Sequence, residues 1–411
     1  MSRAHVWGWL VAGALIAVGS EAKGQDPLPR VSPDDVGLAS EPLQRITQLL
    51  AESVAQERIA GAVVGVARHG RIAYLTPIGV QDIATGVPMS ERSLFRVYSM
   101  TKAVTAVAVM MLHEEGRFEL SDPVSRYLPE FAEVVVLEAD GSTRPPRRPI
   151  TIEHLLLHTA GLSHRSSQEY REANVRSRSI SLDQFVSNVV RVPLRFDPGE
   201  RYLYSASPTV LGRLVEVWSG MSFDEFLRER VLTPLAMHDT GFWVEPGATD
   251  RLTTVYAHSD AGGLRPFAIE EVPFTERPAL LEGSVGLVST VPDFLRFAQM
   301  LLNGGELGGA RILSERTVRE ITRNGLADDI LRTRRGGSGW ALGNVSVVVD
   351  PASAGPGVRA GEFRWDGSAG TEFWVDPDTG TALVTMWQSA PANPDSLRQR
   401  ITGLVRESIR P

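Results

Sequence analysis

Two side chains one helical turn apart, Ser99 and Lys102, carry the chemistry that the sequence indicates most directly. Residues three positions apart share a helix face, so we expect the hydroxyl and the amine to meet. Serine is a weak nucleophile until a base takes its proton, and lysine can be that base once burial lowers its pKa. The spacing predicts an acyl-enzyme on Ser99, with Lys102 as the base.

The use of lysine supports this prediction. The chain has 42 Lys and Arg residues, and only Lys23 and Lys102 among them are lysines. Arginine keeps its proton in a protein, whereas lysine can release it. The one lysine of the expected folded body therefore stands where a base is needed. The alternative is a lysine that extends its amine to solvent from a helix end.

Two further stretches could complete the site. In residues 198–205 a Pro-Gly turn leads into an extended run that contains Tyr204. A lysine ammonium nearby is expected to lower the pKa of this phenol, so that it exchanges protons with the leaving group or with water. In residues 364–371 small residues would let the backbone approach a ligand, and an edge strand could donate an N–H to an oxyanion. A core tyrosine and an ordinary glycine-rich hairpin are the alternatives.

The sequence lacks the residues that several other kinds of catalytic or binding site require. The sequence contains no cysteine, no G-x-S-x-G and no P-loop, which excludes thiolate sites, a nucleophile elbow and that kind of phosphate site. His154 and His158 stand four apart but lack the glutamate and the third ligand of a zinc site. We expect these histidines to pack and to fasten loops, and we expect neither a metal nor a cofactor.

Hydrophobic periodicity predicts the elements that must position these residues. A helix over 99–115 is apolar on all sides and should be buried. Strands from both chain ends with helices between them predict an α+β fold, in which helices from both ends flank one antiparallel sheet and a helical lobe is inserted. Further helices are expected at 40–57, 152–158, 181–190, 207–219, 222–232, 291–303, 314–323 and 394–408, and strands at 61–67, 71–78, 339–349, 361–365, 371–375 and 381–387.

The N-terminus predicts export. A basic start precedes an apolar run, and Ser20-Glu21-Ala22 is a small-x-small cleavage pattern. Residues 1–22 are therefore interpreted as a signal peptide and the mature chain as periplasmic or secreted. An uncleaved anchor is the alternative.

Composition limits the partners. Hydrophobic residues make up 43% and the net charge is −7, as expected for a soluble globular enzyme without a basic nucleic-acid face. Two dense basic runs are interpreted as solvated loops, and for the first a partner patch is the alternative. They are Arg144, Arg147 and Arg148, and Arg332, Arg334 and Arg335. We expect no nucleic-acid partner and no membrane contact after signal cleavage, and the oligomeric state stays open.

Five stretches together resemble the beta-lactamase-related serine hydrolases: class C beta-lactamases, D-Ala-D-Ala peptidases and, most closely, family VIII carboxylesterases. The resemblance implies one catalytic domain over 23–411, with an alpha/beta lobe of about 30–95 plus 335–411 and a mainly helical lobe of about 96–334. The stretches are F-R-V-Y-S-M-T-K at 95–102, L-S-D-P-V-S-R-Y-L-P at 120–129, H-L-L-L-H-T-A-G-L at 154–162, P-G through Y-S at 198–205, and G-L-V-S-T at 286–290.

The resemblance also assigns roles. It implies a site between the lobes, with Ser99 as nucleophile, Lys102 as base and Tyr204 as the second proton-handling group. The oxyanion hole would consist of the backbone N–H groups of Ser99 and Ser368. The residues expected to bind substrate are Tyr98, Ala206, Trp365, Asp366 and Gly367.

Two departures bear on the substrate. The Y-x-N element reads Y-S-A at 204–206, without the amide that would contact a beta-lactam, and the K-T-G element reads W-D-G at 365–367, where family VIII esterases often have W-G-G. An apolar Trp365 and a negative Asp366 disfavour anionic substrates, and strand alternation points Arg364 away.

We therefore expect a carboxylesterase that acts on small neutral esters. The alternatives are a beta-lactamase or D-Ala-D-Ala peptidase, for which Arg359 or Arg364 would have to supply the missing cation, and a non-catalytic scaffold.

Overall fold

The computed structural model describes residues 28–259, 262–268, 273–334 and 336–410. The predicted signal peptide, residues 1–22, lies outside these ranges. Within them, no helix is long and apolar enough to cross a membrane.

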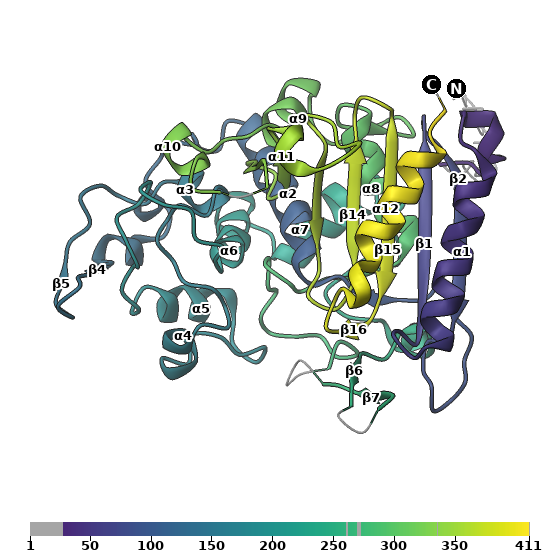
Figure 1. Cartoon of the computed structure of the whole chain (residues 1–411). Coiled ribbons are helices and arrows are strands. Elements are labelled where there is room, and N and C mark those ends of the chain that lie inside the picture. Colours follow the sequence, from purple (N-terminus) through teal and green to yellow (C-terminus); the bar gives the residue numbers. More distant parts are fainter. Residues whose placement is uncertain (1–27, 260–261, 269–272, 335, 411) are drawn as a thin grey trace, which may run out of the picture.

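A seven-stranded antiparallel sheet forms one side of the molecule, in the order β11-β12-β13-β14-β15-β1-β2 (Figure 1). The N-terminal hairpin β1 (Gly61–Arg68) and β2 (Arg71–Gly79) joins the C-terminal strands because β1 pairs with β15 (Thr381–Trp387). The predicted α+β sheet drawn from both chain ends is thus confirmed. The other strands are β11 (Ser338–Trp340), β12 (Ser346–Val348), β13 (Phe363–Asp366) and β14 (Glu372–Asp376).

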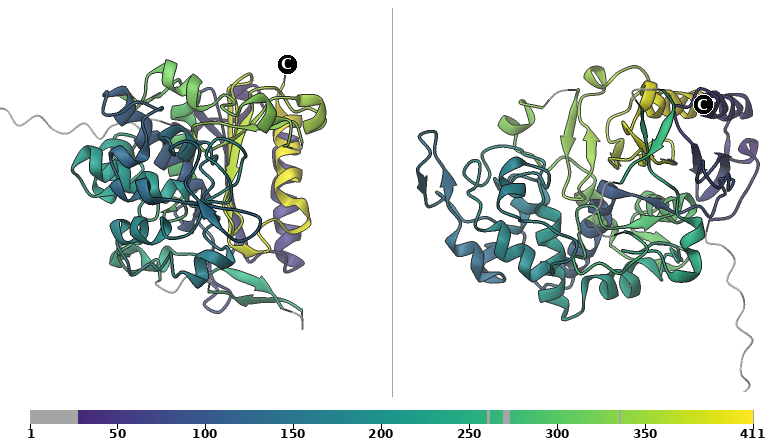
Figure 2. Two further views of the ribbon diagram at one scale, coloured as in Figure 1. Left: turned by 90° about the vertical axis from the view of Figure 1, so that its left-hand side faces the viewer. Right: turned by 90° about the horizontal axis from the view of Figure 1, so that it is seen from below.

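Helices cover both faces of the sheet, which explains why β1 is buried almost throughout. The terminal helices α1 (Ser40–Ala55) and α12 (Leu397–Ser408) pack side by side on one face (Figures 1 and 2). On the other face α8 (Val291–Leu302) contacts β1, β14 and β15. Gly65 permits this approach, because a Cβ there would lie 2.7 Å from Leu295. Helix α8 lies within the range expected for the helical lobe, yet it packs on the sheet.

The helical lobe is built around α2 (Thr101–Glu114), whose residues 101–112 are all buried, as its uniformly apolar sequence predicts. Its main partner is α6 (Ser207–Ser219). The lobe lies on the side of the sheet away from α1 and α12 (Figure 2). Its smaller helices are α3 (Ile152–Leu156), α4 (Gln168–Glu172), α5 (Leu182–Val189) and α7 (Phe223–Leu227).

The expected strand at 339–349 is wrong as a single element. The structure has β11 and β12, paired with each other and joined by a tight turn in which Asn344 has φ +56°. Apolar residues of the turn itself are buried, so burial in the sequence pattern conceals the reversal. The expected helix at 222–232 is also shorter, because α7 gives way to a π-helical turn over Arg228–Leu232.

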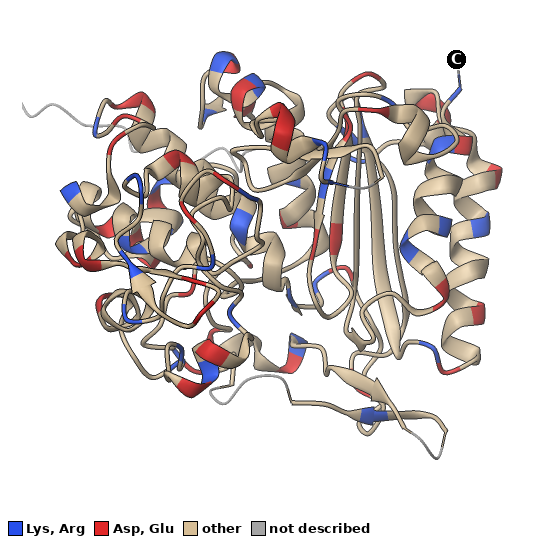
Figure 3. Cartoon of the chain, turned by 60° about the vertical axis from the view of Figure 1, so that its left-hand side comes forward, with Lys and Arg blue, Asp and Glu red and all other residues tan. Residues whose placement is uncertain are grey.

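Short strands outside the main sheet brace the connections. β3 (Phe95–Arg96) pairs with β8 (Val288–Ser289) and so brings the residues before Ser99 next to the 282–288 segment. Acidic and basic residues are interspersed over both lobes (Figure 3). The remaining elements are β4 (Val136–Leu137), β5 (Thr143–Arg144), β6 (Tyr256–His258), β7 (Leu264–Pro266), β9 (Glu306–Leu307), β10 (Ala310–Arg311), β16 (Ser389–Ala390), α9 (Glu315–Ile321), α10 (Asp328–Leu331) and α11 (Pro351–Ala354).

Candidate active site

Ser99 lies in a strained turn at the start of α2. A 3-10 turn over Tyr98–Met100 precedes the helix, and Tyr98 has φ +42°, a left-handed conformation that costs a non-glycine residue energy. The turn leaves Ser99 half-buried while the residues on either side are buried. The serine hydroxyl is therefore presented at the end of a buried helix.

Lys102 meets Ser99 as the spacing predicts. Its Nζ lies 3.2 Å from Ser99 Oγ and donates a hydrogen bond of 2.7 Å to the carbonyl oxygen of Ser284. The residue is only 2% exposed. Burial, and next the positive charge of Arg165, hold the pKa of the Lys102 ammonium well below its ordinary value. The amine is thus positioned and poised to accept the Ser99 proton.

Tyr204 lies beside this pair. Lys102 Nζ is 4.7 Å from the centroid of its ring, and the indole Nε1 of Trp365 donates a 3.1 Å hydrogen bond to its hydroxyl oxygen. Burial raises the pKa of Tyr204, so the expected lowering by lysine is wrong. The lysine faces the ring and is itself driven toward the neutral amine, while desolvation penalises a phenolate. Tyr204 is therefore a neutral phenol in the resting site.

His158 holds the backbone around Tyr204. Its carbonyl oxygen accepts from Leu203 N at 2.9 Å and its Nδ1 accepts from Ser205 N at 3.1 Å. The imidazole is fully buried, and burial, then Lys102, keep its pKa well below the ordinary value. His164 stacks on the Tyr204 ring, with centroids 5.7 Å apart. His158 is thus a loop-fastening residue, but the loop that it fastens carries Tyr204, a link that no spacing in the sequence reveals.

Aromatic side chains form the wall of the site on the sheet side. Trp340 and Trp365 meet edge to face, with centroids 4.5 Å apart, and Trp365 lies 5.3 Å from the Tyr204 ring. The guanidinium of Arg334 covers the Tyr202 ring at 4.2 Å. Trp340 was not among the predicted site residues, because its place depends on the β11–β12 turn.

Asp366 points away from Trp365, as alternation along β13 requires. Its carboxylate accepts a 2.6 Å hydrogen bond from Arg398 of α12. The charge of Asp366 is therefore paired and turned toward the face of the sheet that carries α12. That it disfavours anionic substrates stays a prediction. Its field still reaches the site, where it raises the pKa of Lys102 in opposition to burial.

The two expected oxyanion donors have free N–H groups: neither Ser99 N nor Ser368 N donates a hydrogen bond within the described part of the chain. Ser368 is exposed in the turn after β13. β13 is an inner strand, contrary to expectation, but its pairing with β12 ends at Arg364 and leaves the backbone beyond it open on that side. Gly367 is required in the turn, since a Cβ would lie 2.5 Å from Val97 O.

Two residues expected to bind substrate are instead in the core. Tyr98 is 0% exposed and packs with Ala369 and Val285. Ala206 is 1% exposed, and its N–H donates to Ser163 O at 3.1 Å. Both residues support the site from behind, where a substrate has no access in this structure.

A buried ion cluster adjoins Lys102. Glu282 is fully buried, accepts from Arg176 Nε at 2.7 Å and has Arg165 Nη1 3.8 Å away. Burial opposes ionisation of Glu282, but the two arginines together keep its pKa below the ordinary value. Glu282 lies two residues before Ser284, whose carbonyl oxygen accepts the Lys102 hydrogen bond, so the ion pairs of Glu282 anchor this segment.

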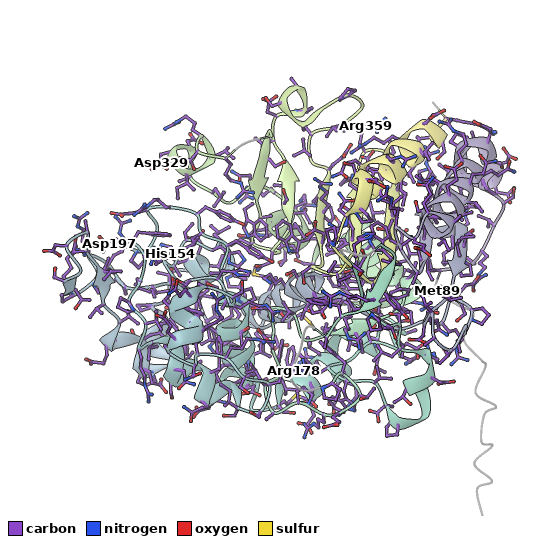
Figure 4. The ribbon with its side chains drawn as sticks, turned by 60° about the horizontal axis from the view of Figure 1, so that its bottom comes forward. Met89, His154, Arg178, Asp197, Asp329 and Arg359 are labelled. Carbon is purple, nitrogen blue, oxygen red and sulfur yellow. The ribbon has the colours of Figure 1, made fainter. Side chains whose placement is uncertain are left out.

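The basic run at 144–148 is partly structural rather than a solvated loop. Arg144 donates to both carboxylate oxygens of the buried Asp197, at 3.0 and 2.7 Å, and Arg147 N donates at 2.8 Å. Asp197 lies at the end of the helical lobe away from the sheet (Figure 4). The Arg144 hydrogen bond is the main cause that lowers the Asp197 pKa to about 2. These contacts hold the β4–β5 hairpin on the lobe.

Metals and separate cavities do not compete with this site. Among the described residues, no cluster of three or more His, Asp or Glu side chains is arranged to hold a metal. A cavity of about 280 Å³ lies between α7 and the 232–248 segment, and its lining includes none of Ser99, Lys102 and Tyr204. The reactive groups therefore define the candidate site.

Comparison with known proteins extends over both lobes. The beta-lactamase family model matches residues 46–405. Protein Rv1367c of Mycobacterium tuberculosis is 36% identical over 349 residues, 81% of this chain and 86% of the relative. Esterase EstB of Burkholderia gladioli is 32% identical over 372 residues, 84% of this chain and 90% of the relative. The solved structure of EstCE1, a hydrolase with promiscuous acyltransferase activity, has a TM-score of 0.79 at 26% identity and covers 89% of this chain and 99% of its own.

Proposed function

The chain belongs to the beta-lactamase family, and on that premise we propose that this serine hydrolase is an exported carboxylesterase that cleaves small neutral esters through an acyl-enzyme on Ser99. The observation that carries the proposal is the 3.2 Å approach of Lys102 Nζ to Ser99 Oγ, made by a buried lysine of lowered pKa. The kinship with Esterase EstB supports ester hydrolysis. The leader at residues 1–22 is the basis for export.

Acylation begins with proton transfer. Lys102 takes the Oγ proton as Ser99 bonds to the ester carbonyl carbon, and the N–H groups of Ser99 and Ser368 receive the oxyanion. The C–O bond to the alcohol then breaks, and the leaving alkoxide takes a proton from Tyr204. The Lys102 ammonium then gives the proton that it took from Ser99 to the Tyr204 phenolate, which restores both groups.

The position of Trp365 prepares Tyr204 for this step. The indole N–H occupies a lone pair of the phenol oxygen, so the phenol O–H is left to donate toward Ser99 or the leaving group. The same N–H stabilises the phenolate while it exists. Water then attacks the acyl-enzyme through the reverse proton path and releases the acid.

The site favours neutral substrates. The two arginines considered as replacements for a carboxylate-binding cation are engaged elsewhere. Arg359, near α12 (Figure 4), pairs with Asp376 at 2.9 Å, and Arg364 pairs with Glu372 at 3.2 Å. Trp365 places an indole where a lysine would stand. An ester without charge needs no cation and has a good leaving group, so ester hydrolysis fits better than beta-lactam hydrolysis.

The proposal is tested with purified mature protein on p-nitrophenyl butyrate and nitrocefin. We expect kcat/KM to be much higher for the ester. A fluorophosphonate probe should add one label to the wild type and none to Ser99→Ala by intact mass. Preference for nitrocefin would contradict the substrate assignment, and equal labelling of both proteins would contradict the nucleophile.

A further inference from the structure

The turn that carries Ser368 is held from the far side of the sheet. We infer that Arg398, on α12, is a positioning residue that fixes the Ser368 N–H for the oxyanion. The inference rests on the proposed function, because it assumes that Ser368 acts on a tetrahedral intermediate. Arg398 belongs to α12, which packs on the sheet face opposite the helical lobe (Figure 2).

One guanidinium joins the two ends of the turn. Arg398 Nη1 donates to Asp366 Oδ2 at 2.6 Å, and Nη2 donates to the carbonyl oxygens of Gly367 at 2.9 Å and Thr371 at 3.1 Å. These acceptors flank Ser368 on both sides along the chain. A planar fork with fixed N–H directions sets such a geometry more narrowly than an ammonium does.

The opposite side of the turn is fixed to the nucleophile segment. Thr371 Oγ1 donates to Val97 O at 3.2 Å, and Gly367 N donates to Thr371 O at 2.7 Å. The turn is thus clamped between Arg398 and the residues just before Ser99. Because both oxyanion donors belong to these two segments, the clamp determines the distance between them.

Exposure shows which partner of the ion pair needs the other. The Arg398 side chain is 7% exposed, whereas that of Asp366 is 48% exposed. A nearly buried guanidinium requires a counter-charge and acceptors, and Asp366 supplies the charge at the edge of solvent. This accounts for an aspartate where the resemblance leads us to expect glycine.

The chain offers a matched control. Arg406 lies two turns further along α12, donates to Glu362 just before β13, and stacks over the Trp374 ring at 5.2 Å. Arg406→Met removes an arginine of the same helix that is paired with the other end of the same strand. It leaves every hydrogen bond of the 366–371 turn intact.

Arg398→Met, Arg398→Lys and Arg406→Met are compared with wild type in three measurements. Active sites are counted by the p-nitrophenol burst, kcat and KM are measured on p-nitrophenyl butyrate, and Ki is measured for an arylboronic acid, whose adduct with serine places an oxygen in the oxyanion hole. We expect Arg398→Met to lose about 10- to 100-fold in kcat per active site and a similar factor in boronate affinity, with KM within about twofold. The kcat and the boronate affinity of Arg398→Lys should lie between those of Arg398→Met and those of the wild type.

Arg406→Met should lower the melting temperature while kcat and Ki per active site stay near wild type. The inference would be wrong if Arg398→Met kept kcat and Ki within threefold of wild type, or if Arg406→Met lost as much of both. If the wild type failed to hydrolyse the ester, the proposed function would fall instead, and the boronate affinities would still decide the role of Arg398.

Discussion

Replacement of Trp365 by phenylalanine tests the hydrogen bond that links the W-D-G stretch at 365–367 to Tyr204. The variant keeps an aromatic ring against Tyr204 and Trp340 but removes the indole donor that lies 3.1 Å from the phenol oxygen. A neutral hydrogen bond contributes about 0.5–1.5 kcal/mol net, and one to a charged group about 1.5–3 kcal/mol. Because the phenol is charged only while it passes its proton, we expect a loss of about 1–2 kcal/mol in the transition state. That corresponds to a fall of about 5- to 30-fold in kcat/KM.

The assay is kcat/KM on p-nitrophenyl butyrate, normalised to active sites from the burst. Trp340→Phe is the matched control, since it also removes an indole donor from the same aromatic cluster, but that donor bonds Leu156 O at 3.2 Å. We expect this control to lower the melting temperature and to lose less activity per active site. A Trp365→Phe enzyme within twofold of wild type, or a control that loses as much, would refute the reasoning.

Three further predictions concern the base and export. Lys102→Arg keeps the charge but accepts no proton, so kcat should fall at least about 100-fold, and a near wild-type rate would point to another base. Lys102 works as the neutral amine, which is present above its lowered pKa and lost as pH falls through it. Arg165→Gln removes a cation that lowers this pKa against the opposing charges of Glu282 and Asp366, so the acid limb of kcat/KM against pH should move to higher pH, and an unmoved limb would contradict the assignment. Expressed in a Gram-negative host, the chain should appear in the periplasm about 22 residues shorter, whereas N-terminal sequencing that finds the leader intact would indicate an anchor.

The sequence predicted those features that depend on short stretches of chain. Ser99 and Lys102 meet because a helical turn brings i and i+3 together in any surroundings. The burial of α2 follows from its uniformly apolar composition. The antiparallel sheet followed from period-two and buried strand patterns at both chain ends.

Other features depend on contacts between distant segments, which no pattern in the sequence reveals. Lys102 and Tyr204 are 102 residues apart in the chain, and no spacing rule brings them together. The packing of α2 against α6 does so. Desolvation of Tyr204 is a property of all the atoms around it, which is why its pKa rises although a lysine lies 4.7 Å from its ring. Period alone also concealed the β11–β12 turn, since the turn residues are as buried as the strands.

The W-D-G stretch at 365–367 shows most clearly which features the sequence predicts and which depend on the tertiary structure. From the sequence, alternation along the strand pointed Arg364 away from Trp365, but both Trp365 and Asp366 were expected to bind substrate. Only the tertiary structure decided which face carries the site, and that Arg398 of the last helix lies under Asp366 with Nη1 at 2.6 Å. Local spacing is set by covalent geometry, whereas the charge that a carboxylate presents to a substrate depends on which distant cation the fold places beside it.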